Sequence, residues 1–134
     1  MKQLLVATRN THKTGEISAI LGDAFEVSDL SGVPEAPEVE ETGATFGENS
    51  TLKAVAISKV SERLVLADDS GLEVDALEGA PGVRSARYAG SHGDDCSNNQ
   101  KLLAELQGVP PEKRTARFRC VMVVARAGAV LGEF

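Results

Sequence analysis

Several familiar sequence patterns are missing from this chain of 134 residues, and each absence removes a class of function. It contains neither a Walker A loop (G-x-x-x-x-G-K-[ST]) nor a dinucleotide-binding G-x-G-x-x-G, so the two usual phosphate loops are excluded. No apolar run approaches the roughly eighteen residues of a membrane span, and the run after Lys2 is too short for a signal-peptide core. We therefore expect a cytoplasmic protein.

Cysteine and positive charge are also scarce. Cys96 and Cys120 match no C-x-x-C pattern and no cysteine–histidine ligand spacing, so neither a zinc site nor a disulfide framework is expected. The 20 Asp and Glu residues outnumber the 14 Lys and Arg residues, for a net charge of −6, which disfavours a nucleic acid polymer as partner because that affinity depends on clustered cations. A nucleotide stays compatible with this charge, since a divalent cation held by carboxylates reverses it locally.

The first segment with a chemical signature is residues 4–13, LLVATRNTHK. Residues 4–7 indicate a buried strand that ends in a polar stretch. Further along, Ile17, Ile20 and Leu21 stand at the spacing i, i+3, i+4, which predicts a helix with these side chains on one face.

The start of that helix suits an anion. Asn10 or Thr11 can cap it, and Lys13 would lie in its first turn. A helix N-terminus offers unpaired N–H groups and the positive end of the helix dipole, so we predict a phosphate site here. The alternative is an ordinary capped helix with a solvated lysine.

A strand, an acidic loop and a second helix come next. Gly22 ends the first helix and residues 25–30 alternate as a strand. The loop that follows is rich in Pro, Gly and Glu. Its acidic residues are Glu38, Glu40 and Glu41.

The second helix begins with a capping box, Thr45-x-x-Glu48. Lys53 is expected to project from it. Its predicted apolar face consists of Leu52, Val55, Ala56 and Val60.

Residues 64–77, LVLADDSGLEVDAL, are the most informative stretch. A buried strand over residues 64–67 runs into Asp68-Asp69-Ser70-Gly71, and a second strand over residues 72–76 is predicted to pair antiparallel with it. Two adjacent acids at the end of a buried strand favour a functional site, and the alternative is a plain turn.

The remaining segments complete an α/β pattern of mixed parallel and antiparallel strands in one domain. We expect a loop carrying Arg84, Arg87 and Tyr88, and a helix over residues 97–107. A strand follows, with a tight turn at Ala127-Gly128 into a partner strand. The core stripe of the helix is predicted to be Leu102, Leu103 and Leu106, and His12 and His92 are expected in solvent.

These residues permit one chemistry in particular. The Asp68–Asp69 and Glu40–Glu41 pairs supply the oxygen ligands that Mg²⁺ prefers, with phosphates and waters completing its shell. Lys13 and Lys53 supply charge for phosphate oxygens. A carboxylate that takes a proton from water would complete a triphosphate-hydrolysing site.

Four segments, LLVATRNTHK, EETGATFGENSTLKA, ADDSGLEVDALEGAPGVRSARYAG and RFRCVMVVA, closely resemble the Ham1/RdgB-type inosine triphosphate pyrophosphatases in order and spacing. The resemblance implies a cytosolic, usually homodimeric, Mg²⁺-dependent enzyme that converts ITP, dITP or XTP to the monophosphate and pyrophosphate. It also implies an elongated, mixed α/β fold of two lobes with the active site in the cleft between them.

The resemblance assigns roles position by position. Asp69 matches the metal-binding acid that accepts the proton, Glu41 a metal-linked acid, and Asp68 a second acid in the metal shell or in support of Asp69. The positions that match substrate contacts, or lie among them, are Thr8, Arg9, Asn10, Thr11, His12, Lys13, Lys53 and Ser70.

Two departures from the family pattern bear on function. Arg9 stands where the family usually has Gly. The family's later Phe-Gly-Tyr-Asp and Ser-His-Arg motifs, which shape the base pocket, are absent, so we expect a form lacking the C-terminal part. Two alternatives stay open: a Maf-like pyrophosphatase, although its Ser-x-x-Arg-Arg corner differs from TRNTHK here, and an inactive fragment that binds only phosphate and metal.

Overall fold

The protein is described by a computed structural model covering residues 2–134. The chain divides into two compact units, the first running to Asp68 and including Val121–Phe134, the second formed by Asp69–Cys120. The prediction of a single domain stays a prediction. In chain order the helices and longer strands are β1 (Lys2–Val6), α1 (Thr11–Leu21), β2 (Phe25–Asp29), α2 (Phe46–Ser58), β3 (Leu64–Val74), α3 (Asp95–Glu105), β4 (Ala116–Arg126) and β5 (Ala129–Glu133).

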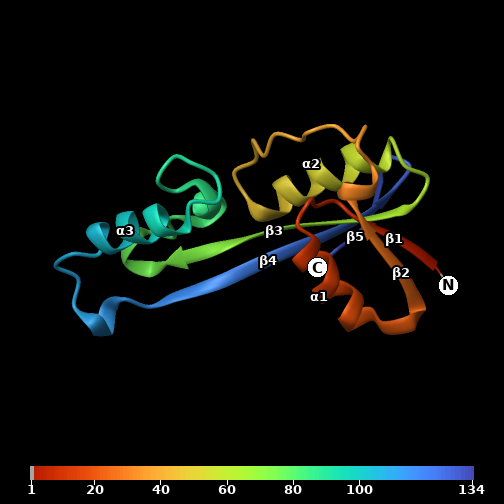
Figure 1. The fold of residues 1–134 in the computed structure, drawn as a ribbon. Helices are drawn as coiled ribbons and strands as arrows, with labels where there is room; N and C mark the ends of the chain where they lie inside the picture. The colour runs from red at the N-terminus through yellow and green to blue at the C-terminus, as the bar shows by residue number, and fades with distance from the viewer. Residues whose placement is uncertain (1) are drawn as a thin grey trace. The chain divides into compact units, whose positions relative to one another are not determined.

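The strands form one mixed sheet in the order β2-β1-β3-β4-β5, which confirms the predicted α/β class (Figure 1). β1 pairs parallel with both β2 and β3, and β4 pairs antiparallel with β5. No helix within residues 2–134 is long and apolar enough to cross a membrane.

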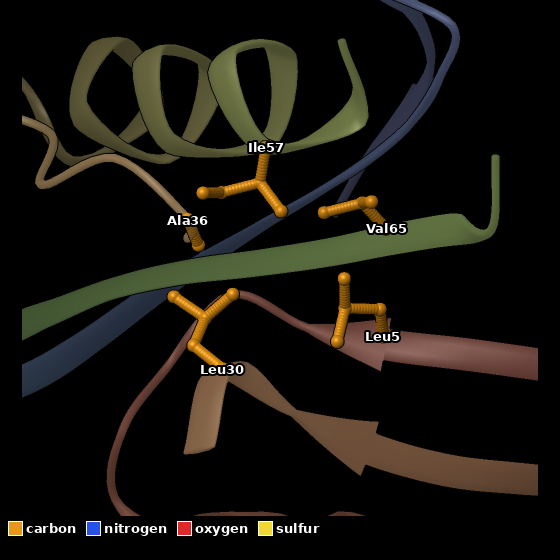
Figure 2. Close-up of a cluster of buried hydrophobic side chains, with 5 residues drawn as sticks. All are labelled: Leu5, Leu30, Ala36, Ile57 and Val65. Carbon is orange, nitrogen blue, oxygen red and sulfur yellow. The ribbon is translucent and has the colours of Figure 1, made fainter. Parts of the chain in front are cut away.

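The core of the first unit lies on both faces of the sheet because the side chains of β1 alternate. Leu5 points to the face covered by α2, where it packs with Ile57 and Val65 (Figure 2). Leu4 and Val6 point to the other face, where they pack with Ile17 of α1 and Leu66 of β3. The two helices therefore cover opposite faces, and each is fixed by its own apolar cluster.

The predicted break in β3 is wrong. The structure has one continuous strand from Leu64 to Val74, so Asp68, Asp69 and Ser70 lie within it, not in a turn between two antiparallel strands. Asp, Ser and Gly favour turns when no partner holds the chain extended, but the sheet pairing of β3 overrides that preference here. The strand passes from the first unit into the second at the two aspartates.

The predicted apolar face of α2 is also wrong. Leu52 and Val60 are exposed, whereas Asn49, Ser50 and Ser58 are buried. Each of these polar groups has a partner that offsets its burial. Asn49 Oδ1 accepts from the Gly43 N–H at 2.7 Å, Ser50 Oγ donates to the Val121 carbonyl at 2.7 Å, and Ser58 Oγ accepts from the Gly128 N–H at 2.9 Å. The buried face of α2 is therefore mixed: Phe46, Ala54 and Ile57 supply its apolar part, and the hydrogen-bonded polar residues supply the rest.

Smaller differences concern α1 and α3. Ile17 is buried as predicted, but Ile20 is 82% exposed because α1 turns Ile17 and Leu21, not Ile20, into the core beside β2. Helix α3 begins two residues earlier than predicted, with Asp94 as its cap, and its Leu103 is exposed while Leu106 is buried.

The hairpin between β4 and β5 turns at Ala127 and Gly128, as predicted. Both residues have positive φ, 51° and 82°, the combination that a two-residue turn of type I′ requires. Glycine adopts this conformation freely and alanine does not.

This turn predicts two stability changes of opposite sign. Gly128→Ala should lower the free energy of unfolding by about 1 kcal/mol, because its Cβ would be strained at this φ. Ala127→Asn should raise that free energy by roughly 0.5 kcal/mol, because asparagine tolerates the left-handed region. Urea titration followed by circular dichroism measures both, and two shifts of the same sign would contradict this account of the turn.

Candidate functional site

The order of the parallel strands marks where a ligand can bind. From β1 the chain passes through α1 to β2 on one side, and later through α2 to β3 on the other side of β1. Because α1 and α2 cover opposite faces, a ligand site is expected beyond the carboxyl end of β1, beside the part of β3 that follows its pairing with β1. The pairing of these strands ends where the Ala7 N–H donates to the Leu66 carbonyl at 2.8 Å. The chain beyond that point leaves β1 toward α1, while β3 continues to Val74.

The chain leaving β1 forms a tight polar corner. Thr8 Oγ1 accepts from the Asn10 N–H at 3.1 Å, and Asn10 Oδ1 accepts from the N–H groups of His12 and Lys13 at 3.1 and 3.3 Å. Asn10, not Thr11, is therefore the cap of α1. Thr8 orients the cap, and the cap fixes the first turn that carries Lys13.

Lys13 reaches from α1 to β3. Its Nζ lies 3.1 and 3.0 Å from the two carboxylate oxygens of Asp68. The alternation of β3 places Asp68 on the same face as Leu64 and Leu66, which is the face that α1 covers. The carboxylate is largely buried, with 11% of its side chain exposed, so the lysine offsets much of its desolvation.

Lys53 brings a second cation to the same residue from α2. Its Nζ donates to the main-chain carbonyl of Asp68 and lies 3.3 Å from Glu41 Oε1, with only 16% of the lysine side chain exposed. The loop that carries Glu41 is anchored on α2, because the Gly43 N–H donates to Asn49 Oδ1 at 2.7 Å. A side chain at Gly43 would place its Cβ 2.6 Å from that of Glu48, so this close approach requires glycine.

The structure thus brings together four of the predicted site residues, Lys13, Glu41, Lys53 and Asp68, from four separate segments of the first unit. Two ammonium groups and two carboxylates meet around one strand residue. The oxygens of a phosphate chain are negatively charged, so they can replace the carboxylates as ion-pair partners of the two lysines. The cluster is therefore suited to an anionic ligand bound together with a cation, because the lysines can contact the anion and the carboxylates the cation.

Other predicted residues have different surroundings. Arg9 Nη2 donates to the Ala36 carbonyl at 3.2 Å, which ties the corner to the loop before α2. His12 Nε2 lies 2.9 Å from Glu16 Oε1, and 86% of the histidine side chain is exposed, which confirms that it lies in solvent. Thr11 and Glu40 are exposed as well.

Asp69 and Ser70 belong to the second unit. Asp69 is buried, with 8% of its surface exposed. Ser70 is exposed and borders a cavity of about 400 Å³, which Ser85, Tyr88 and Phe118 also line. Ser85 Oγ accepts from the Leu72 N–H at 2.9 Å and thereby holds its loop to β3.

Tyr88, one of the polar residues predicted on this loop, is engaged with α3. Its hydroxyl donates to the Glu105 carboxylate, and the ammonium of Lys101 lies 4.3 Å from the centre of its ring. Burial, together with the Glu105 charge, raises the pKa of Tyr88 to about 12. The phenol therefore stays protonated at neutral pH and acts as a hydrogen-bond donor.

Sequence reasoning missed a carboxylate beside the corner. Asp29, the last residue of β2, is buried and accepts from the hydroxyl of Thr14, one residue after Lys13. Hydrogen bonds from Ser31 and Thr14 hold the pKa of Asp29 below its usual value of 3.8. Its position at the end of a strand was the available signal, but an isolated Asp before a turn is usually just a turn residue.

The sequence model of the Ham1 family matches residues 4–133. The chain belongs to the Ham1 family. This decides between the two enzyme families that the motifs left open, the Ham1 type and the Maf type.

The curated relatives of this Ham1-family chain include two proteins named dITP/XTP pyrophosphatase. That of Geobacillus kaustophilus is 54% identical over 129 residues, which cover 96% of this chain and 63% of the relative. That of Listeria monocytogenes is 53% identical over 126 residues, covering 93% of this chain and 62% of the relative. The chain therefore spans a little over three fifths of the length of these relatives.

Solved Ham1 structures share its fold. The HAM1 protein from Coxiella burnetii superposes with a TM-score of 0.87 at 36% identity, covering 98% of this chain and 68% of that one. The Ham1 protein of Staphylococcus aureus gives a TM-score of 0.83 at 42% identity, covering 93% and 64%. The mixed sheet and its helices are thus the Ham1 arrangement.

The pairing of Lys13 with Asp68 predicts measurable coupling. In a double-mutant cycle of Lys13→Met and Asp68→Asn, the coupling free energy should be about 1 kcal/mol in urea unfolding, because the pair is partly buried and bidentate. The exposed His12–Glu16 pair on the same helix is the control, with an expected value below about 0.5 kcal/mol in a cycle of alanine variants. Equal coupling free energies in the two cycles would contradict the conclusion that burial strengthens the Lys13–Asp68 pair.

Proposed function

We propose that this chain carries the catalytic groups of a dITP/XTP pyrophosphatase, which hydrolyses ITP, dITP or XTP to the nucleoside monophosphate and pyrophosphate. The observation that carries the proposal is the meeting of Lys13 and Lys53 at Asp68, just beyond the carboxyl end of β1. The names of the relatives support the substrate class.

The phosphate chain is bound at the corner in this proposal. Lys13 and Lys53 exchange their carboxylate partners for phosphate oxygens, and the positive end of α1 adds to the attraction. Thr8 and Asn10 hold the first turn in place. Arg9, Thr11 and His12 line the same corner, and Ser70 is proposed as a further substrate contact.

The carboxylates fit Mg²⁺. Within residues 2–134 no group of three or more His, Cys, Asp and Glu side chains is close enough to hold a metal by itself. That suits Mg²⁺, which usually binds through one or two carboxylates with substrate phosphates and waters. Glu41 and Asp69 are the proposed ligands, with Asp68 in support. When bound, Mg²⁺ offsets the charge on the phosphate oxygens.

Asp69 is the proposed proton acceptor. Its carboxylate takes a proton from a water molecule, whose oxygen forms a bond to the α-phosphorus while the bond from that phosphorus to the bridging oxygen breaks. Pyrophosphate leaves with the electrons of the broken bond, and the other product is the nucleoside monophosphate, which carries the oxygen from water.

Cellular location and assembly follow from the family resemblance alone. We propose a cytosolic enzyme that works as a homodimer, with a nucleoside triphosphate as its partner molecule and neither membrane nor nucleic acid polymer bound. Preference for dITP and XTP over dTTP and UTP, measured as release of pyrophosphate, tests the substrate class.

The role of Asp69 predicts a loss of turnover without a loss of fold. Asp69→Asn should lower kcat for dITP by about a hundredfold or more, because an amide cannot accept the proton from water. Glu112→Gln, at an exposed carboxylate of the same unit away from the cavity beside Ser70, is the matched control and should keep kcat within about twofold. Near-normal turnover in Asp69→Asn, with an unchanged circular dichroism spectrum, would remove Asp69 from the proposed chemistry.

The role of Lys13 predicts a loss that depends on the ligand. Lys13→Ala should weaken dITP binding by about tenfold and dIMP binding by much less, because the ammonium acts as a point charge on the outer phosphates. Titration calorimetry with Asp69→Asn as background measures binding without hydrolysis. An equal loss for both ligands would place Lys13 away from the triphosphate.

A further inference from the structure

The connection from β1 to α1 is held by the end of β2. Asp29 lies beside Val6 in the parallel register, and its carboxylate is buried. Oδ1 accepts from the Ser31 N–H at 2.9 Å and from the Ser31 hydroxyl, and Oδ2 accepts from the hydroxyl of Thr14 on α1. One carboxylate therefore joins the end of a strand to the first turn of a helix.

These donors are all neutral groups, so the carboxylate depends on them for solvation. A buried carboxylate is stable only when its oxygens accept hydrogen bonds, and such bonds are stronger than those between neutral groups. The lowered pKa of Asp29 is consistent with an ionised group at neutral pH. Thr14 is thus held toward β2 by a charge-assisted hydrogen bond.

The position of Thr14 fixes the direction of Lys13. Neighbouring residues of an α-helix point about 100° apart around its axis, so holding Thr14 toward β2 sets the angle at which the Lys13 side chain leaves α1. In that orientation Lys13 Nζ lies 3.0 Å from Asp68 Oδ2. The residue that follows β2 holds the other end of the connection, because the Leu30 N–H donates to the Thr8 carbonyl at 2.9 Å.

We infer that Asp29 is a positioning residue for the phosphate site, acting through Thr14 to hold the first turn of α1 so that Lys13 points into the site. The inference rests on the proposed function for the identity of the ligand. Asp29 itself is not expected to touch the nucleotide.

The test uses inorganic triphosphate with Mg²⁺ as the probe, titrated calorimetrically into the intact chain. Thr14→Val removes the donor at nearly constant shape, and Thr14→Ser keeps it. We expect Thr14→Val to raise Kd by about tenfold with unchanged stoichiometry. Thr14→Ser should keep Kd within about twofold of the wild-type value. Ser18→Ala, which removes a hydroxyl one turn later on the same helix, is the control and should leave Kd within about twofold.

A second variant tests whether the two residues act as one unit. Asp29→Asn should raise Kd for triphosphate to a similar extent. The double variant with Thr14→Val should have a Kd no higher than the higher of the two single-variant values, because both substitutions remove the same contact. Independent effects that multiply would overturn the inference.

The remaining outcomes separate this inference from the proposed function. A purely structural role would lower the stoichiometry, because fewer molecules are folded, and would leave Kd unchanged; that result overturns the inference. A wild-type chain that binds and a Thr14→Val variant that binds equally well also overturn it, with the phosphate site intact. A wild-type chain that does not bind triphosphate overturns the proposed function and the inference together.

Discussion

The contact between the ammonium of Lys13 and the carboxylate of Asp68 is the constraint on which the first unit depends. A carboxylate on an inner strand is unstable without a partner, and the partner must come from the helix that covers that face of the sheet. Helix α1 can supply it only if its first turn lies at the end of β1, which the cap by Asn10 and the apolar contact of Ile17 together ensure. The packing of Ile17, the cap by Asn10 and the Lys13–Asp68 ion pair thus all require the same position of α1 on the sheet.

Helix α2 serves the same centre from the opposite face, and it does so with buried polar groups. Asn49 holds the acidic loop through Gly43, Ser50 binds the Val121 carbonyl, and Ser58 holds the β4–β5 hairpin through Gly128. Hydrogen bonds of this kind fix position more sharply than apolar contacts do, because they are lost when a donor moves by a fraction of an ångström. The loop that carries Glu41 and the helix that carries Lys53 are thereby held to one another.

The sequence predicted what depends on local signals. Strand β1, the capping residue Thr45 and the turn at Ala127-Gly128 follow from propensity and short-range hydrogen bonding, and all are present. The cap of α1 was narrowed to Asn10 or Thr11, and the structure has Asn10. The convergence of Lys13 and Lys53 could be anticipated only from the motifs, because no local rule places α1 and α2 on opposite faces of one strand.

The failures have one physical origin, which is that tertiary contacts override local preference. Asp68-Asp69-Ser70-Gly71 has turn composition but stays extended because β3 is paired along the sheet. The face of α2 was misjudged because Asn49, Ser50 and Ser58 share its buried side with apolar residues, and a periodicity of apolar residues alone cannot detect such a mixed face. Asp29 was missed because its partners, Thr14 and Ser31, identify it only in three dimensions.

The central proposal is that the groups gathered around Asp68 belong to an enzyme that cleaves a purine nucleoside triphosphate between its α- and β-phosphates. The most direct measurement is ³¹P NMR of dITP incubated with the protein and Mg²⁺. The account predicts that the triphosphate resonances are replaced by those of dIMP and pyrophosphate only. Release of inorganic phosphate with dIDP, or a triphosphate spectrum that does not change, would contradict it.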